Sequence, residues 1–262
     1  MRSVRQAAVL LHARIVERPL ILLSNDDGHF SRGIQAMRAA LSKIGDVVVA
    51  APETEQSAAS HALSLHKPLR LRRVEEGVFA VDGTPADCVY VALHAENRVL
   101  PRRPDLVVSG LNHGLNLGQD VFYSGTVAAA REGALRGLPA IATSAHVKSD
   151  FAAAAEVCAG LALKVLACPT QDAVLLNVNF PREWPNGIRT TKLGSRHYEE
   201  VLDFRKDPRG RDYLWIGGPG VRHDPNPGSD TDAYDQGAIS ITPLVLDLTS
   251  ATHVSLLKEL ST

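Results

Sequence analysis

The feature that most constrains the fold of this chain is an alternation of short apolar segments with longer helix-like segments, from Leu20 to about Asn179. The apolar segments contain few polar residues, which is typical of parallel strands covered on both faces. This alternation predicts an α/β fold, a Rossmann-like three-layer sandwich around a mostly parallel, doubly wound sheet. We expect strands at Leu20–Ser24, Asp46–Ala50, Leu106–Ser109, Ala140–Ser144 and Val174–Val178, and helices at Ser31–Ile44, Ala86–Glu96, Ser124–Arg136 and Phe151–Ala167.

Two hairpins are expected on this framework. Leu69–Arg73 and Val78–Val81 flank a Glu-Glu-Gly turn and predict an inserted antiparallel hairpin. After Pro181 the chain is rich in Gly, Pro, Asp and Arg, and the turn 207–210 separates two polar strand candidates, His197–Phe204 and Asp212–Ile216. These strands predict a projecting C-terminal arm.

We therefore divide the chain into an extension, residues 1–18, and one domain, residues 19–262. The domain comprises a core at about 19–181 and 237–248, the arm at about 187–236, and a C-terminal helix at about 250–260. The stretch 217–228 reads as a loop, and Ala238–Thr242 as a returning strand. The Arg-rich extension is compatible with a targeting segment, an added helix or a start codon placed too early, and we favour a cytoplasmic extension.

Composition excludes some classes of partner. A formal net charge of -1 and an aromatic content of 5% do not favour nucleic acid or an anionic membrane. No apolar run approaches the roughly 18 residues of a membrane helix. Three cysteines without metal-type spacing fit a reducing compartment, so we expect a cytoplasmic protein.

Two adjacent carboxylates end the first predicted strand. Asp26 and Asp27 follow it directly, and ligands of open α/β sheets bind at the carboxyl ends of strands. Neighbouring carboxylates repel one another unless a cation or proton intervenes, and their oxygens suit Mg²⁺ or Mn²⁺. The alternative is an ordinary polar turn, because Asn, Asp and Gly favour turns.

Four further polar, often glycine-rich segments also follow strands or begin helices. Ser57 or Ser60 offers a hydroxyl after the second strand, and Asn112 lies in a Gly/Asn-rich segment after the third. Asp82 and Asp87 flank a Gly-Thr-Pro turn, where Asp87 serves equally well as a helix-end charge. Tyr123-Ser124-Gly125-Thr126 opens a helix whose N-terminus favours anions. If the fold brings these groups together at the carboxyl-end edge of the sheet, they make a site for a divalent metal ion and a phosphate group, which is suited to metal-assisted hydrolysis.

These segments, in this order, resemble the motifs of the survival protein SurE family of nucleotidases. The resemblance rests on 24–28, 56–61, 83–88, 109–114, 123–126 and 229–244. It implies one divalent metal ion per subunit (Mg²⁺, Mn²⁺ or Co²⁺), held by Asp26, Asp27, Ser57 and Asn112. It also implies a homodimer or homotetramer that exchanges its C-terminal arm. The loop His29-Phe30-Ser31-Arg32-Gly33 and the first 18 residues depart from the family pattern.

We expect a metal-dependent phosphomonoesterase that hydrolyses nucleoside 5′- and 3′-monophosphates, with short polyphosphate allowed by the resemblance. Asp26, Asp27 and Asn112 are its expected catalytic residues. Asn25, Ser124, Gly125 and Thr126 are its expected phosphate- and substrate-binding residues. The alternatives are a nucleoside hydrolase, which releases free base, and a non-catalytic nucleotide-binding protein. His61 and His113 are expected to be bystanders, and no G-x-G-x-x-G motif supports a dinucleotide oxidoreductase.

Overall fold

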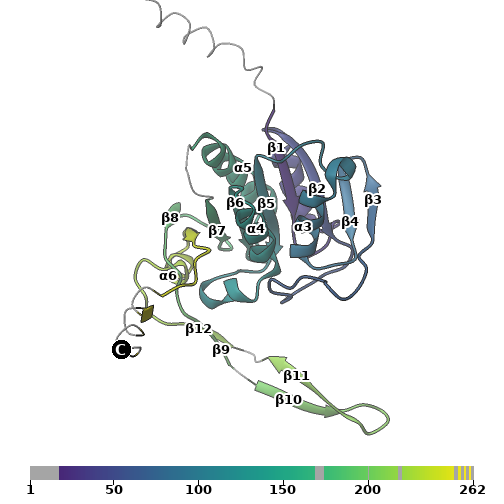
Figure 1. Cartoon of the computed structure of the whole chain (residues 1–262). Helices are drawn as coiled ribbons and strands as arrows, with labels where there is room; N and C mark the ends of the chain where they lie inside the picture. The colour runs from purple at the N-terminus through teal and green to yellow at the C-terminus, as the bar shows by residue number, and fades with distance from the viewer. Residues whose placement is uncertain are drawn as a thin grey trace, which may run out of the picture.

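A nine-stranded sheet forms the centre of the protein (Figure 1). The computed structural model describes residues 18–168, 174–199, 201–217 and 220–250, together with 253, 254, 257 and 260. In chain order the strands of the sheet are β1 (Leu20–Ser24), β2 (Asp46–Pro52), β3 (Leu71–Glu75), β4 (Val78–Val81), β5 (Leu106–His113), β6 (Ala140–Ala145), β7 (Leu175–Phe180), β8 (Ile188–Thr190) and β13 (Ile239–Leu244).

The sheet is mostly parallel and doubly wound, as predicted. Its strand order is β3-β4-β2-β1-β5-β6-β7-β13-β8, and the six strands from β4 to β7 are parallel to one another. Antiparallel pairs flank these six strands: β3 pairs with β4 as the predicted inserted hairpin, and β13 returns against β7. The edge strand β8 pairs parallel with β13. From β1 the chain first builds outward through β2 and then through β5 on the other side. The boundary between β1 and β5 is therefore the topological switch point, where open α/β sheets bind ligands.

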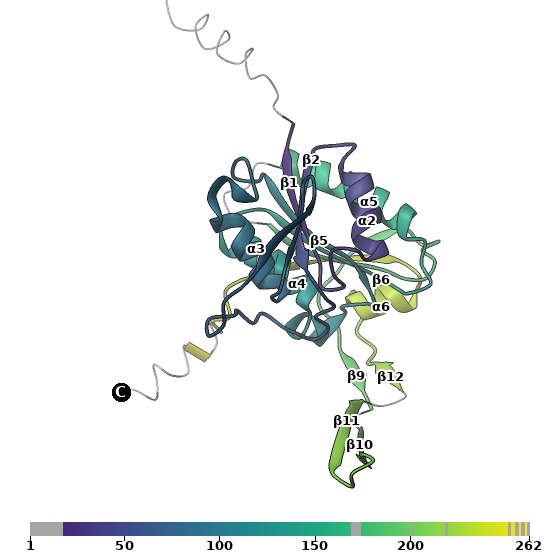
Figure 2. The ribbon, with the colours of Figure 1, turned by 90° about the vertical axis from the view of Figure 1, so that its right-hand side faces the viewer.

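Helices cover both faces of the sheet. Helices α2 (Arg32–Leu41) and α5 (Phe151–Ala167) lie on one face, and α3 (Pro85–His94) and α4 (Gly125–Leu135) lie on the other (Figure 2). Each face has its own apolar cluster, and all five residues of β1 are buried between them. Two-sided burial explains why the core strands read as continuous apolar runs.

Side chains outside the helices fix where the helices begin. Ser31 and Ser124 cap α2 and α4, so each helix starts one residue later than predicted. Thr84 and Asp87 form a reciprocal capping box at α3. Asp87 therefore has the helix-end role that the sequence left open, and Asp82 accepts a hydrogen bond from the Arg70 backbone N–H, 2.6 Å away.

The arm consists of two successive two-stranded ladders instead of one hairpin. β9 (Arg196–Tyr198) pairs with β12 (Val221–His223), and β10 (Val201–Lys206) pairs with β11 (Asp212–Gly217). The predicted single strand His197–Phe204 and the predicted loop 217–228 are thus wrong in detail. β12 is three residues long, and its strand conformation comes from pairing with β9. The arm projects from the end of the molecule at which the parallel strands terminate (Figure 1).

Several short elements besides β12 were not predicted. Among them are β8 and the one-and-a-half-turn helix α6 (Asp230–Asp235), which lies where the arm returns to the sheet. Residues 253, 254, 257 and 260 are helical, and the rest of the predicted C-terminal helix and residues 1–17 lie outside the described residues. Within the described part of the chain, no helix is long and apolar enough to cross a membrane.

Candidate functional site

A cavity of about 420 Å³ opens at the carboxyl ends of β1, β2 and β5, at the switch point of the sheet. Its lining includes all four predicted metal ligands, Asp26, Asp27, Ser57 and Asn112. It also includes Ser124, which caps α4. The structure therefore brings together residues that are up to 98 positions apart, as expected from the shared rim of a parallel sheet.

Asp26 is the buried member of the carboxylate pair. Its side chain accepts a hydrogen bond from the Thr126 hydroxyl at the start of α4. Burial raises the pKa of Asp26 to about 6; the charge of Asp27 adds to this shift, and the Thr126 hydrogen bond opposes it. Because burial disfavours the charged form of this carboxylate, a cation beside it would stabilise that form.

Asp27 lies closer to the cavity mouth and is held by the end of β5. Its Oδ2 accepts a hydrogen bond from the His113 backbone N–H at 3.1 Å, and its Oδ1 is 3.9 Å from Nδ1 of the same histidine. Burial raises the pKa of Asp27 above its ordinary value, and His113 opposes the shift. His113, expected to be a bystander, lines the cavity and fixes the orientation of Asp27.

Neutral oxygens complete the predicted ligand set. The Asn112 amide Nδ2 donates to the Gly114 carbonyl at 3.0 Å, which fixes the amide and leaves its oxygen as the donor atom for a cation. Ser57 donates to Glu55 at 2.6 Å and is exposed. Hydrogen bonds hold the Ser57 loop beside the carboxylates. The Gln56 N–H donates to the Asp26 carbonyl, and the Ser60 hydroxyl and N–H donate to the Phe122 and Tyr123 carbonyls, respectively.

The start of α4 packs directly against Asp26. A β-carbon on Gly125 would lie 2.9 Å from the Asp26 β-carbon, so only glycine permits this approach. The Ser124 hydroxyl accepts from the Val127 N–H at 3.0 Å. The N–H groups of Gly125 and Thr126 belong to the first turn, which has no preceding carbonyls to bond. The helix N-terminus thus presents anion-binding groups beside the carboxylates.

Two of the predicted phosphate-binding side chains have internal partners. Asn25 is fully buried, and its amide donates to the Gly28 carbonyl and the Ser31 hydroxyl, both at 2.9 Å. The Thr126 hydroxyl is engaged by Asp26. Among the four predicted phosphate residues, Ser124 is the one whose side chain lines the cavity. Sequence spacing placed all four near the site, and packing assigns Asn25 and Thr126 to holding it together.

The charge of the cavity favours a cation. Asp26, Asp27, Glu55 and Asp120 line it, and its described lining residues include no lysine or arginine. A phosphate anion requires a positive partner in such surroundings. Hard oxygen donors from two carboxylates, an amide and a hydroxyl fit Mg²⁺ or Mn²⁺. Within the described chain, no group of three or more His, Cys, Asp or Glu side chains is arranged to hold a metal, so the proposed ligand set rests on two carboxylates completed by neutral oxygens.

Sequence reasoning missed several residues around the cavity. Glu55 lies in the expected loop, whereas Asp120 and Tyr198 lie on the 3-10 helix η2 (Gly118–Phe122) and on β9. His61 does not line the cavity and instead bonds buried Glu132 of α4 at 2.9 Å. No local pattern marks Asp120 or Tyr198, because their proximity depends on where the arm leaves the core.

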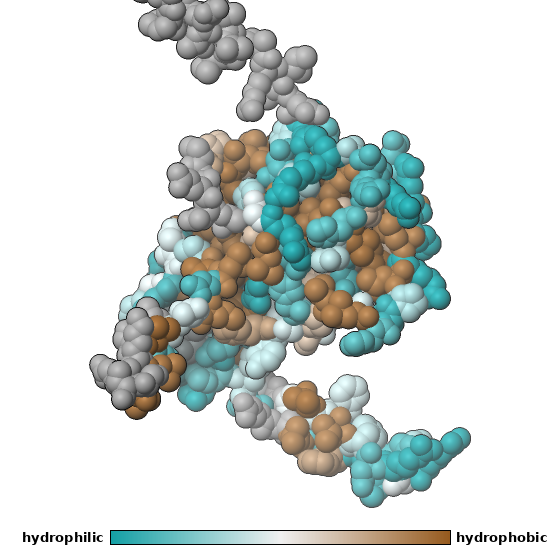
Figure 3. All heavy atoms as spheres, viewed as in Figure 1, coloured by the Kyte–Doolittle hydropathy of each residue, from teal (hydrophilic) through white to brown (hydrophobic). Residues whose placement is uncertain are grey.

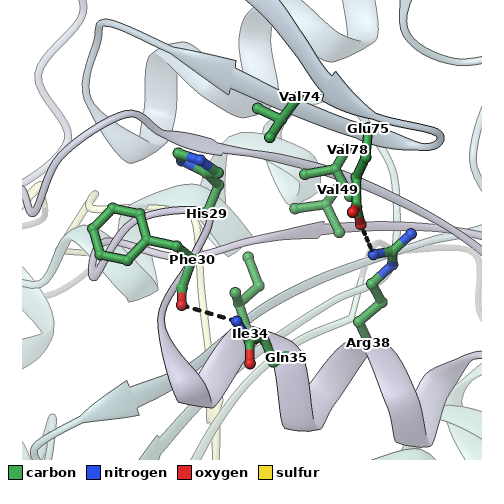
Figure 4. A pocket seen from close by; sticks show the side chains of 9 residues that line it. All are labelled: His29, Phe30, Ile34, Gln35, Arg38, Val49, Val74, Glu75 and Val78. Carbon is green, nitrogen blue, oxygen red and sulfur yellow. Dashed lines mark hydrogen bonds and ion pairs between the residues drawn. The ribbon is translucent and has the colours of Figure 1, made fainter.

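The loop that departs from the family pattern faces a different pocket. His29 and Phe30 line an apolar pocket of about 210 Å³ between α2 and the β3–β4 hairpin, bordered by the Arg38–Glu75 ion pair (Figure 4). Arg32 donates to the Val147 carbonyl at 2.9 Å and lies over the Phe151 ring. The side chains that differ from the family pattern therefore lie outside the carboxylate cavity.

Fold and cavity together define a doubly wound α/β protein with a carboxylate-rich ligand site at its switch point. The family model of the survival protein SurE matches residues 21–200. A protein named 5′-nucleotidase SurE from Sorangium cellulosum is 62% identical over 90% of this chain and 93% of its own length. A protein of the same name from Myxococcus xanthus is 51% identical over 87% and 88%.

A solved structure agrees with these matches. The crystal structure of the SurE protein from Aquifex aeolicus is 40% identical, superposes with a TM-score of 0.79, and is matched over 93% of this chain and 100% of its own. The chain therefore belongs to the survival protein SurE family.

Proposed function

We propose that this protein is a divalent-metal-dependent 5′-nucleotidase that hydrolyses nucleoside monophosphates to nucleoside and phosphate. One observation carries the proposal: a carboxylate pair, buried Asp26 and partly buried Asp27, adjoins an anion-binding helix start in a cavity lined by four carboxylates. The names of the relatives from Sorangium cellulosum and Myxococcus xanthus support the same activity.

Four residues would hold the metal: Asp26, Asp27, Ser57 and Asn112. When bound, the metal neutralises phosphate charge and lowers the pKa of a water molecule for attack on phosphorus. The protein's own contribution is to position these groups. Thr126 holds Asp26 by its hydroxyl, and His113 holds Asp27 by its backbone N–H.

The start of α4 would bind the phosphoryl oxygens. Its free N–H groups and the Ser124 hydroxyl offer hydrogen bonds to an anion, and the helix dipole favours the same charge. These groups recognise a phosphoryl group and not the sugar. The proposal therefore extends to nucleoside 3′-monophosphates and short polyphosphates.

Product analysis tests the proposal. Purified protein is incubated with a panel of nucleoside monophosphates, first with EDTA and then with Mg²⁺, Mn²⁺ or Co²⁺ restored, and phosphate and nucleoside are quantified. We expect phosphate release that disappears with EDTA and returns with metal. Release of free base would indicate a nucleoside hydrolase instead, and binding without any release would indicate a nucleotide-binding protein.

We further propose that the arm joins subunits into a homodimer or homotetramer. Four apolar side chains on β10 and β11 are between 54% and 85% exposed: Leu202, Phe204, Trp215 and Ile216. Figure 3 shows the resulting apolar cluster on the arm, away from the core. Exposed apolar patches of this kind mark interaction surfaces.

We also propose a cytoplasmic location. Cys88, Cys158 and Cys168 are all free thiols, and the first two are buried. Free thiols persist in a reducing compartment, which supports the proposal.

A further inference from the structure

Two tyrosines line the carboxylate cavity and have no part in the metal and phosphate chemistry described above. They are Tyr123, immediately before Ser124, and Tyr198, on β9 at the root of the arm. Both residues are largely solvent-exposed, at 67% and 51%. Among the described residues, neither ring packs against another aromatic ring. Two aromatic surfaces are therefore available to a ligand in this cavity.

Tyr198 is held in a fixed position by a polar cluster. Its hydroxyl donates to Asp120 Oδ1 at 2.8 Å, and burial together with this bond raises the pKa of Tyr198 to about 12. The hydroxyl thus stays protonated as a donor. Arg196 forms an ion pair with the same carboxylate, and its guanidinium lies 5.3 Å from the Tyr198 ring centroid. Because the cation covers one side of the ring, a flat ligand has the other side to stack on.

Tyr123 belongs to the same short segment as the anchor of Tyr198. Its backbone N–H donates to the Asp120 carbonyl at 3.0 Å, and its own carbonyl accepts from the Ser60 N–H at 3.0 Å. Asp120 therefore ties both tyrosines together, one through the backbone and one through its side chain. Both tyrosines line the same cavity as Ser124, at the proposed phosphate position.

We propose that Tyr123 and Tyr198 form the nucleobase subsite, in which the base of the substrate stacks on their rings. The inference rests on the proposed nucleotidase function and names the part of the substrate that the metal and phosphate groups leave unrecognised. The cavity volume of about 420 Å³ is in the range of sites that bind small molecules, so a nucleoside monophosphate is of a suitable size. Stacking depends on ring area and tolerates any base. The subsite therefore favours purines over pyrimidines without selecting one purine.

Kinetics with and without a base test this subsite. KM and kcat are measured for AMP, GMP, CMP and ribose 5-phosphate, which lacks a base, with the parent protein and Tyr198→Leu, Tyr123→Leu and Tyr198→Phe. Each leucine variant is expected to raise KM for AMP and GMP about 10-fold, with a smaller rise for CMP, kcat within about 2-fold, and ribose 5-phosphate unchanged. Tyr198→Phe keeps the ring and is expected to retain most of the purine preference. Tyr90→Leu, on the outer side of α3, is the matched control.

The outcomes separate this inference from the proposed function. Equal rises in KM for AMP and ribose 5-phosphate, or unchanged KM for AMP in both leucine variants, would overturn the subsite while leaving the nucleotidase intact. If the parent released no phosphate at all, the proposed function would fail. Calorimetric binding of AMP against ribose 5-phosphate would then decide the subsite: a preference for AMP that the leucine variants lose supports it, and no preference overturns it.

Discussion

Replacing Asp26 by Asn is expected to stabilise the metal-free protein at neutral pH, although it removes a proposed metal ligand. Burial raises the Asp26 pKa from 3.8 to about 6. Below 3.8 the residue is protonated in both states and costs nothing. Between pH 3.8 and about 6 the unfolded chain has lost this proton while the folded protein retains it, so stability falls as the pH rises. At about 1.4 kcal/mol per pH unit, the loss reaches about 3 kcal/mol above pH 7.

Asparagine removes this penalty and keeps the local geometry. Its amide oxygen can still accept the hydrogen bond from the Thr126 hydroxyl, so the contact with α4 is retained. Urea unfolding of parent and Asp26→Asn is measured in EDTA at pH 7.5 and at pH 4. We expect the variant to be more stable by about 2–3 kcal/mol at pH 7.5 and by less than about 1 kcal/mol at pH 4.

A second titration adds Mn²⁺ at pH 7.5. The parent is expected to gain stability with metal concentration, and Asp26→Asn to gain much less, because a ligand that binds the folded state stabilises it by mass action. Asp46→Asn, an exposed carboxylate at the opposite end of β2, is the control. A variant that is no more stable than the parent in EDTA at pH 7.5 would show that the buried Asp26 charge does not destabilise the fold.

Three further predictions concern the ligand set and the arm. Asp27→Asn is expected to lower turnover at least ~100-fold, about 2.7 kcal/mol of barrier, and near-normal turnover at saturating metal would exclude it as a ligand. Ser57→Ala is expected to raise the metal concentration for half-maximal activity about 10-fold with unchanged thermal stability, since an exposed neutral ligand is lost; an unchanged metal requirement would contradict its role. Deleting residues 201–217 removes β10 and β11 but keeps Arg196 and Tyr198. It is expected to lower the solution mass measured by light scattering, and an unchanged mass would argue against assembly through the arm.

The sheet was predictable because its strands are buried on both faces. β1 has its predicted bounds, since Pro19 precedes the apolar run and polar residues follow it at once. α5 also has its predicted bounds, because Asp150 caps it. The rim position of Asp26 and Ser57 followed from the fact that each comes after a strand of one parallel sheet. Asn112 reaches the same rim inside β5, which continues to His113, four residues beyond its predicted end.

The finer features depend on contacts that no local pattern encodes. β12 becomes a strand only through pairing with β9, and Tyr198 reaches the cavity only because the arm leaves the core beside η2. The internal roles of Asn25 and Thr126 depend likewise on side-chain packing around the Asp26 loop. Residue type predicted that these side chains lie near the site, and three-dimensional packing determined what they contact.

The most direct test of the account is a crystal structure of the protein soaked with Mn²⁺, with the metal located by its anomalous scattering. We expect one site per subunit in the carboxylate cavity, coordinated by oxygens of Asp26, Asp27, Asn112 and Ser57 at about 2.0–2.3 Å. Asp27→Asn treated in the same way should show the site weakened or empty. Manganese bound elsewhere in the parent protein, or a cavity that stays free of metal at saturating concentration, would contradict the account.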